Sequence, residues 1–257
     1  MTNTRNKHYF ISDLHLGIGD SRQREQEFIR WLDFVKNDAE AIYLLGDIFD
    51  FWFEYRNVIP KGFVRMQGKI AELTDSGITV HWFLGNHDMW IFNYMETELG
   101  VKIHRHPIRQ TIQGKNVLIG HGDGLGPGDS RYKFIKKAFA CKINQTLFAF
   151  FHPRIGIGLG NYFSRKSRLA NLSNCNNNTE TNPKITNGNN EMLVRYCESI
   201  VKTENIDCFI FGHSHHTAYH TLSNGSRYIN TGEWVYHSFY AVMENGTIVL
   251  KTFPKFE

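Results

Sequence analysis

Short apolar runs alternate with longer segments of helical periodicity over the first half of the chain. The apolar runs are rich in Ile, Val, Leu and aromatic residues, and each ends at a turn containing Gly, Asp, Asn or His: His8–Ser12, Ala41–Leu45, Ile78–Leu84 and Val117–Gly120. Between them, Arg22–Lys36 and Phe63–Asp75 carry apolar residues at helical spacing. This alternation predicts βαβ units, which place the residues that follow each strand at one edge of a sheet.

The pattern changes to short strands near the C-terminus. The predicted strands are Asp207–Phe211, Ala218–Leu222, Arg227–Asn230, Ser238–Met243 and Thr247–Phe253. Asn-Gly pairs at 224–225 and 245–246 indicate the tight turns of hairpins. We therefore expect an α/β protein in which two sheets pack face to face with helices outside.

An insertion at about 129–190 interrupts this scaffold. Its first part, Tyr132–Phe151, has phenylalanines at helical spacing interleaved with lysines, whereas Asn171–Asn190 contains nine Asn in twenty residues and predicts a mobile loop. A chain of 257 residues favours a single domain over two. We expect one domain, 1–257, that carries this basic and aromatic insertion.

Composition favours a folded protein of the cytosol. The chain is 41% hydrophobic and 21% charged, which argues against disorder. No apolar run is long enough to span a membrane, Met1–Asp13 lacks the pattern of a signal peptide, and the four cysteines show no CxxC spacing. Residues 130–179 contain nine basic and no acidic residues, so the remaining 20 basic and 25 acidic residues leave about −5 elsewhere. This segment therefore predicts an anionic partner.

Five turns hold residue types that bind metal ions, and each directly follows a predicted strand. They are Asp13-Leu14-His15, Gly46-Asp47, Gly85-Asn86-His87-Asp88, Gly120-His121-Gly122-Asp123 and Gly212-His213-Ser214-His215. Each turn alone is compatible with an ordinary turn or helix cap. Together they predict a metal centre at the ends of the strands, and the mixture of carboxylate and imidazole suits Mn²⁺, Fe²⁺ or Zn²⁺.

The order of these turns resembles the signature of the calcineurin-like metallophosphoesterases from Asp13 to His215. The resemblance implies a four-layer α/β/β/α sandwich with two divalent metal ions, which we expect to be Mn²⁺. Its implied ligands are Asp13, His15, Asp47 and His215 for one ion, and Asp47, Asn86, His121 and His213 for the other. Two ions about 3.5–4 Å apart need a shared ligand, and a carboxylate such as Asp47 can bridge them. His87 is then expected to be an acid or electrostatic stabiliser whose ring is oriented by Asp88, although His87 could instead be a plain turn residue.

Within that family the chain is most similar to the UDP-2,3-diacylglucosamine hydrolases, in Asp13–Gly17, Leu44–Trp52 and His121–Tyr132. This likeness implies cleavage of a pyrophosphate bond to UMP and 2,3-diacylglucosamine 1-phosphate in lipid A biosynthesis, with the insertion as a lid over the acyl chains. The substrate contacts it implies are Asn86, His87, Asp129, Tyr132, Ser167, Asn171 and His213. Cations beside apolar walls suit such a substrate, and a basic, aromatic helix also suits peripheral contact with an anionic membrane.

Two departures keep other functions open. His87 stands where Arg is typical, and Asn174 stands where a lid lysine is expected, although Arg165, Lys166 and Arg168 lie nearby. The alternatives are a metallophosphatase for a soluble nucleotide or phosphomonoester, and a non-catalytic binding module on the same fold. Nucleic acid is a weaker candidate, because the aromatic residues have helical spacing rather than that of a strand platform. The sequence does not predict an oligomeric state.

Overall fold

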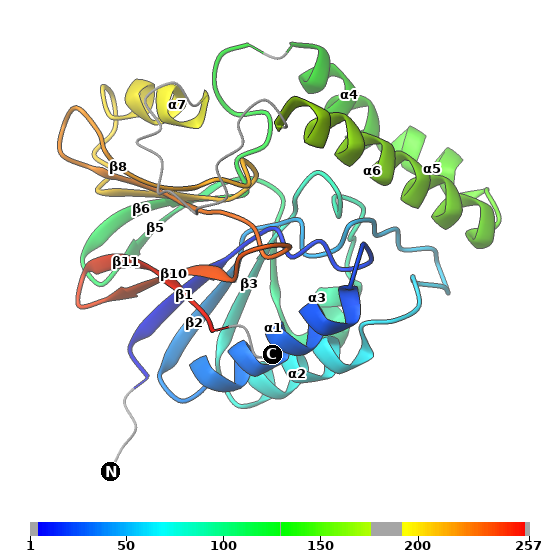
Figure 1. Ribbon diagram of the computed structural model, residues 1–257, viewed down its shortest axis with the longest axis horizontal. Coiled ribbons are helices and arrows are strands. Elements are labelled where there is room, and N and C mark those ends of the chain that lie inside the picture. Colours follow the sequence, from blue (N-terminus) through cyan, green and yellow to red (C-terminus); the bar gives the residue numbers. More distant parts are fainter. Residues whose placement is uncertain (1–4, 129, 176–191, 255–257) are drawn as a thin grey trace.

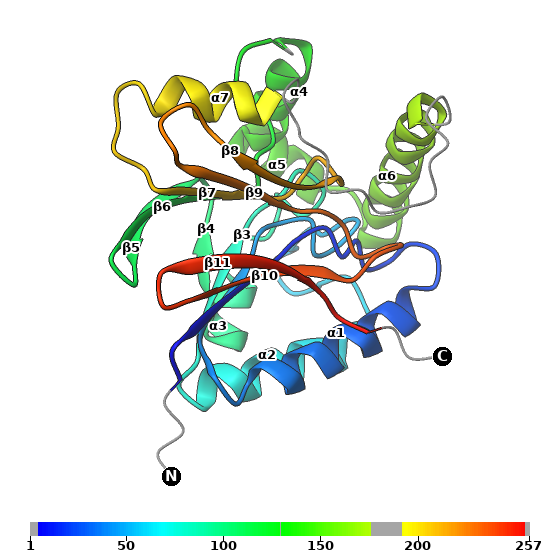
Figure 2. The same ribbon diagram turned by 60° about the vertical axis from the view of Figure 1, so that its left-hand side comes forward.

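The computed structural model describes residues 5–128, 130–175 and 192–254, with the side chains of 167–175 left out. Two sheets lie face to face, and helices cover their outer faces (Figures 1 and 2). The predicted α/β/β/α sandwich is thereby confirmed. Among the described residues, no helix is both long and apolar enough to cross a membrane.

The first sheet has six strands in the order β11-β10-β1-β2-β3-β4. Their bounds are β1 (Lys7–Ile11), β2 (Ala39–Leu44), β3 (Thr79–Phe83), β4 (Lys102–His104), β10 (Phe239–Glu244) and β11 (Thr247–Thr252). Strands β1 to β4 are parallel, with Phe10 of β1 opposite Tyr43 of β2, and β10 runs antiparallel to β1. The carboxyl ends of β1, β2 and β3 therefore meet at one edge.

The second sheet has five strands in the order β5-β6-β7-β9-β8. Their bounds are β5 (Ile108–Ile112), β6 (Lys115–Ile119), β7 (Cys208–Phe211), β8 (Thr217–Thr221) and β9 (Arg227–Thr231). Strands β6, β7 and β9 are parallel, so the loops after β6 and β7 also lie together. The sequence patterns missed β4 and β5, which lack a long apolar run.

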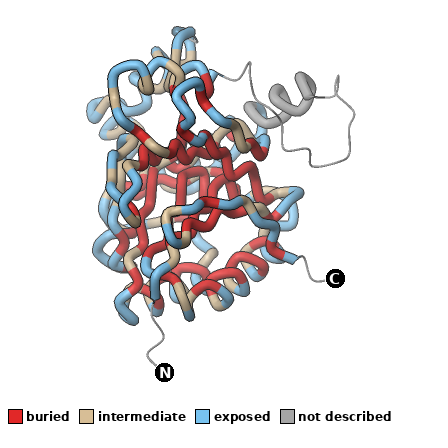
Figure 3. The backbone as a smooth tube through the Cα atoms, turned by 90° about the vertical axis from the view of Figure 1, so that its left-hand side faces the viewer, coloured by how far each residue is buried: buried red, intermediate tan, exposed pale blue. Residues whose placement is uncertain are grey.

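Alternation along the strands builds three apolar layers. On β2, Ile42 and Leu44 face the helices α1 (Ser21–Val35), α2 (Val64–Asp75) and α3 (Tyr94–Leu99), whereas Tyr43 packs in the layer between the sheets. Helix α7 (Met192–Ile200), which the sequence patterns also missed, covers the outer face of the second sheet. The buried strands run through the middle of the molecule (Figure 3).

Three helices follow the loop after β6 and stand beside the two sheets (Figure 1). They are α4 (Ser130–Ala140), α5 (Lys142–Ala149) and α6 (Pro153–Cys175), and we call them the lid helices. The predicted helix Tyr132–Phe151 is present but divided in two at Cys141. The predicted loop is wrong for residues 171–175, which continue α6, and its remainder, 176–190, lies outside the described residues.

Candidate metal centre

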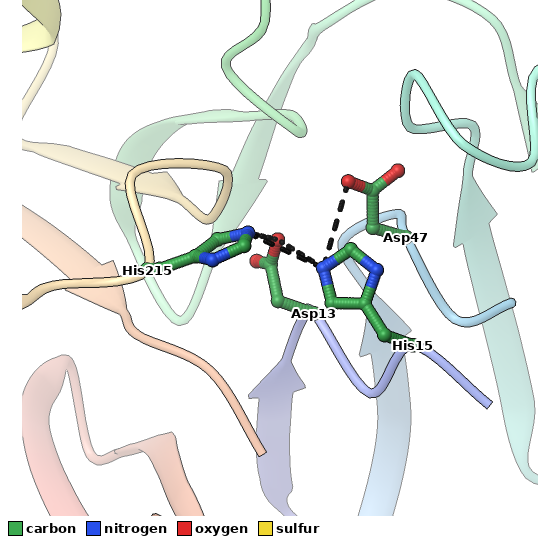
Figure 4. A group of neighbouring side chains, drawn as sticks. All are labelled: Asp13, His15, Asp47 and His215. Carbon is green, nitrogen blue, oxygen red and sulfur yellow. Dashed lines mark hydrogen bonds and ion pairs between the residues drawn. The ribbon is translucent and has the colours of Figure 1, made fainter. Parts of the chain in front are cut away.

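The loops after β1, β2, β3, β6 and β7 bring the seven predicted metal ligands to one place. One group consists of Asp13, His15, Asp47 and His215, whose side chains point toward one another (Figure 4). A second group consists of Asp47, His121 and His213, and the side-chain oxygen of Asn86 lies 3.3 Å from Nε2 of His121. Asp47 belongs to both groups, as a bridging ligand must.

The distances within both groups suit shared coordination. In the first group, Oδ1 of Asp13 lies 3.3 Å from Nε2 of His215 and 3.6 Å from Nε2 of His15. In the second, Oδ2 of Asp47 lies 3.4 Å from Nε2 of His121, and the same oxygen lies 3.9 Å from Nε2 of His15. Ligand atoms around one ion are separated by about this much, since each bond is about 2.0–2.2 Å long.

The charge balance also fits divalent cations. Asp13 and Asp47 are at most 1% exposed, and buried carboxylates this close together require compensating positive charge. Oδ1 of Asp13 accepts no hydrogen bond from the part of the chain that the structure describes. Burial raises the pKa of Asp13, but the rings of His15 and His215 hold that pKa well below its ordinary value. Asp13 is thus held in its anionic form near neutral pH.

Hydrogen bonds outside the ligand set hold the ligands in orientation. Nδ1–H of His121 donates to the carbonyl oxygen of Leu45 at 2.7 Å, which leaves Nε2 as the nitrogen available to a metal. The backbone N–H of His213 donates to Oδ2 of Asp13 at 2.9 Å, and that of His87 donates to Oδ1 of Asp47 at 2.8 Å. The remaining carboxylate oxygens, Asp13 Oδ1 and Asp47 Oδ2, are those that face the histidine rings.

The backbone of the ligands is itself strained. Five of them have positive φ, a conformation that is uncommon for residues other than glycine: Asp13 (54°), His15 (46°), Asp47 (52°), His213 (68°) and His215 (58°). Such residues cluster where the surrounding structure imposes an arrangement needed for function. The cluster therefore marks this edge of the sheets as the functional site on grounds independent of residue type.

Glycines in the turns allow the ligand loops to approach one another. A Cβ on Gly46 would lie 2.7 Å from Nδ1 of His121, and one on Gly85 would overlap the carboxylate of Asp47. A Cβ on Gly212 would overlap Ser12 and Asp13 in the same way. Each glycine is thus required by its neighbour on another loop.

The structure corrects the role expected for Asp88. Its carboxylate accepts hydrogen bonds from the backbone N–H groups of Gly85 at 2.8 Å and Ile48 at 2.9 Å, which joins the loops after β3 and β2. Burial, followed by the nearby charge of Asp47, raises the pKa of Asp88 to about 7. The expectation that Asp88 orients the ring of His87 is therefore wrong.

Asp50 occupies the place expected for Asp88. The backbone oxygen of Asp50 lies 3.0 Å from Nδ1 of His87, and its carboxylate oxygen Oδ1 lies 3.4 Å from Nδ1 of His15. Sequence reasoning missed Asp50 because it lies three residues beyond Gly46-Asp47, inside an apolar run. Its spacing from Asp47 was the available signal.

Arg24 is a second residue that the sequence patterns did not single out. It is 5% exposed on α1, and its guanidinium donates to the carbonyl oxygens of Leu14, His15 and Ile18 at 2.6–2.9 Å. These three bonds fix the loop that carries His15. The available sign in the sequence was the position of Arg24 on the apolar face of the predicted helix, four residues before Phe28.

A cavity of about 470 Å³ adjoins the metal centre beneath the lid helices. Asn86, His87 and Tyr132 line it, so three of the predicted substrate contacts share one cavity. The hydroxyl of Tyr132 donates to Oδ2 of Asp123 at 2.9 Å, and its ring lies 6.3 Å from that of His213. Asp129 and the side chains of Ser167 and Asn171 lie outside the described residues, so these three contacts stay predictions.

The rest of the cavity wall is mostly apolar. Its apolar lining consists of Phe51, Met89, Trp90, Ile135, Phe139, Phe148, Leu159 and Phe163. Nε1–H of Trp90 donates to the carbonyl oxygen of Phe139 at 2.9 Å, which ties the body to α4. Lys136 also lines the cavity, and its Nζ pairs with Asp123 Oδ2 at 2.6 Å. A ligand here would meet an apolar wall and one of the predicted metal ligands, Asn86, in the same cavity.

A family model described as calcineurin-like phosphoesterase matches residues 7–217. The chain belongs to this family. It is 35% identical over 98% of its length to the whole UDP-2,3-diacylglucosamine hydrolase of Porphyromonas gingivalis. It is also 27% identical to the protein of that name from Histophilus somni, over 89% of this chain and 92% of the relative. A solved dimetal phosphatase from Danio rerio is 15% identical, with a TM-score of 0.47 over 99% and 98% of the two chains.

The family and the geometry agree on the class of chemistry. The relatives are named hydrolases, and the two ligand groups fit divalent metal ions. The chain is therefore a metal-dependent phosphoesterase. Its centre joins carboxylates, imidazoles and an amide oxygen, a ligand set that suits hard or borderline cations.

Proposed function

We propose that this chain hydrolyses the pyrophosphate bond of UDP-2,3-diacylglucosamine to UMP and 2,3-diacylglucosamine 1-phosphate, using two Mn²⁺ ions. The observation that carries the proposal is the cavity that reaches from Asn86 and His87 to the aromatic wall of the lid helices. A substrate with a diphosphate in its middle and acyl chains at one end needs both kinds of wall in one cavity. The relatives named for this substrate support the assignment.

Different residues of the chain have different roles in the proposed hydrolysis. Two divalent ions bound here would supply an activated water and neutralise charge on phosphoryl oxygens. Asp47 would be a ligand of both ions, and the hydrogen bond from the backbone N–H of His87 keeps Oδ1 of Asp47 in place. His87 lines the cavity beside Asn86, and its ring, when protonated on both nitrogens, donates a hydrogen bond to the departing phosphate oxygen. The aromatic wall excludes water from the acyl chains.

The test is release of UMP from the lipid nucleotide by purified protein with Mn²⁺, measured by chromatography. Asp47→Ala is the control, and it should abolish both metal uptake and hydrolysis. Absence of UMP together with hydrolysis of a soluble nucleotide or phosphomonoester would replace the proposed substrate by that class. Partner binding without turnover by any phosphoester would favour the non-catalytic module.

His87 separates the two hydrolase functions. A phosphatase for soluble monoesters relies on His87 as its acid, so His87→Arg should lower its rate strongly. A lipid pyrophosphatase can use Arg at this position to bind a substrate phosphate, so the same variant should keep UMP release. The two outcomes are read from kcat on the lipid nucleotide and on a phosphomonoester.

We also propose that the outer side of the lid helices contacts an anionic membrane. Exposed apolar side chains of the lid helices that do not line the cavity include Phe134 (73% exposed), Ile143 (69%) and Phe150 (83%). The same helices carry lysines and arginines without one acidic residue between 130 and 175. Apolar side chains among cations suit an interface with anionic lipid headgroups.

Vesicle sedimentation tests this contact. The protein should sediment with phosphatidylglycerol vesicles and not with phosphatidylcholine vesicles, and Phe134→Ser with Phe150→Ser should abolish sedimentation. Val64→Ser, which removes an equally exposed side chain (74%) from α2, is the matched control and should have no effect. Equal loss in the control, or equal binding to both lipids, would contradict the proposal.

A further inference from the structure

One lid side chain reaches the loops of the metal centre. Ser164 on α6 is 7% exposed, and its hydroxyl donates to Oδ2 of Asp50 at 2.5 Å. The hydroxyl oxygen of Ser164 also lies 3.0 Å from Nδ1 of His87. Asp50 follows β2 and His87 follows β3, so Ser164 joins the lid to both loops at once.

The hydrogen-bonding pattern assigns the proton on the ring of His87. A hydroxyl has one proton, and here a carboxylate takes it, so the oxygen of Ser164 can only accept from His87. The other neighbour of Nδ1, the backbone oxygen of Asp50 at 3.0 Å, is also an acceptor. Nδ1 therefore carries a proton, and Nε2 is the nitrogen left to meet the substrate.

Ser164 lies where the lid approaches the body most closely. Gly160 and Gly156 precede it at intervals of four residues, so the three share one face of α6. A Cβ on Gly160 would overlap the ring of Phe51, and one on Gly156 would overlap the hydroxyl of Tyr55. We call the face of α6 that carries Gly156, Gly160 and Ser164 the close face. Its contact with the body sets the position of Ser164 relative to His87.

We propose that Ser164 is a positioning residue that fixes the placement of the His87 ring only when the lid is seated. Resting on the proposed function, this links lid closure over a substrate to the alignment of the group that meets the departing oxygen. An open lid would leave His87 without one of its two close acceptors. Hydrolysis by a chain with an open lid would then be slower.

Kinetics on two substrates test the proposal. With saturating Mn²⁺, Ser164→Ala should lower kcat by roughly 10- to 100-fold, the cost of a misplacement on the order of 1 Å. The loss should be similar on the lipid nucleotide and on bis(p-nitrophenyl) phosphate, with little change in KM. Ser164→Thr, which keeps the hydroxyl, should restore most of kcat, and Asn161→Ala, which truncates an exposed residue of α6, should leave it unchanged.

Two further measurements separate positioning from a general structural role. In the metal-free protein, the side-chain ¹H–¹⁵N signals of His87 should shift in Ser164→Ala and should stay at their wild-type positions in Asn161→Ala. In a His87→Asn background, Ser164→Ala should cause no further loss of kcat.

Different failures have different meanings. A wild type that cleaves bis(p-nitrophenyl) phosphate but releases no UMP would overturn the proposed substrate, and the role of Ser164 would still be tested on the small ester. Wild-type kcat in Ser164→Ala, an unchanged His87 spectrum, or a rise in KM on the lipid alone would overturn the role of Ser164.

Discussion

Adding one methyl group to the close face of α6 should displace the lid and slow hydrolysis. Gly160→Ala places a Cβ against the ring of Phe51, well inside the distance of about 3.5–4.0 Å at which carbon atoms normally meet. The helix must move by about 1 Å to relieve this overlap. The hydroxyl of Ser164, now 2.5 Å from Asp50 Oδ2, would then reach the limit of about 3.5 Å for a hydrogen bond.

Gly158 supplies the matched control. It lies on the same helix, and an added Cβ would meet nothing within 4 Å. Both substitutions replace glycine by alanine, which stabilises an exposed helix by about 1 kcal/mol. Only Gly160→Ala should disturb the contact between lid and body, so a difference between the two variants cannot come from helix propensity.

Steady-state kinetics and hydrogen exchange provide the assay. Gly160→Ala should lose roughly 10- to 100-fold in kcat, as expected for a misplacement of about 1 Å. Its α6 amides should also exchange faster than those of the wild type. Gly158→Ala should match the wild type in kcat and exchange more slowly. Equal kcat in the two variants would refute the idea that the seating of α6 controls the site.

Three other perturbations have defined outcomes. Asp123→Asn weakens the pairing with Lys136 and should raise KM for the lipid nucleotide about tenfold. Hydrogen exchange of the α4 amides, measured by mass spectrometry, should become faster in the same variant. Arg24→Met removes three carbonyl contacts and should lower the free energy of unfolding by about 2–4 kcal/mol and weaken Mn²⁺ binding, whereas exposed Arg22→Met should do neither. Burial lowers the pKa of His81 from 6.5 to about 3, so its stabilisation is complete above pH 6.5 and is lost on acidification. In urea unfolding, His81→Phe should reduce the loss of unfolding free energy between pH 7 and pH 5 by about 2 kcal/mol.

The ligand set could be predicted from sequence because strand order alone brings it together. Asp13, Asp47 and Asn86 each follow a parallel strand of one sheet, and His121 and His213 each follow a parallel strand of the other. Residues in such loops share one edge whatever the details of packing. The short apolar runs and the turns that follow them were therefore enough to predict both the fold and the metal centre.

The contacts of the lid could not be predicted, because they depend on how α6 packs. The stretch Gly156–Gly160 has low intrinsic helix propensity, yet it is helical because its glycines allow close contact with Phe51 and Tyr55. Ser164 and Asp50 meet across that contact although 114 residues separate them. No local pattern encodes such a pair.

The structure contradicts the expectations for Asp88 and for residues 171–175. Asp88 was assigned to His87 because the two are adjacent in sequence, but its buried carboxylate is needed by backbone N–H groups of two loops. An Asn-rich composition predicted a loop from Asn171, but α6 continues to Cys175. For Asp88, tertiary contacts overrode the signal of sequence adjacency.

Metal content of the Asp47→Ala variant tests the account most directly, because Asp47 is the one side chain that belongs to both ligand groups. After dialysis against Mn²⁺, elemental analysis of the wild type should find two ions per chain. Asp47→Ala should retain fewer than one and should hydrolyse no phosphoester. Two retained ions in the variant, or turnover that survives removal of all metal from the wild type, would contradict the shared-ligand centre.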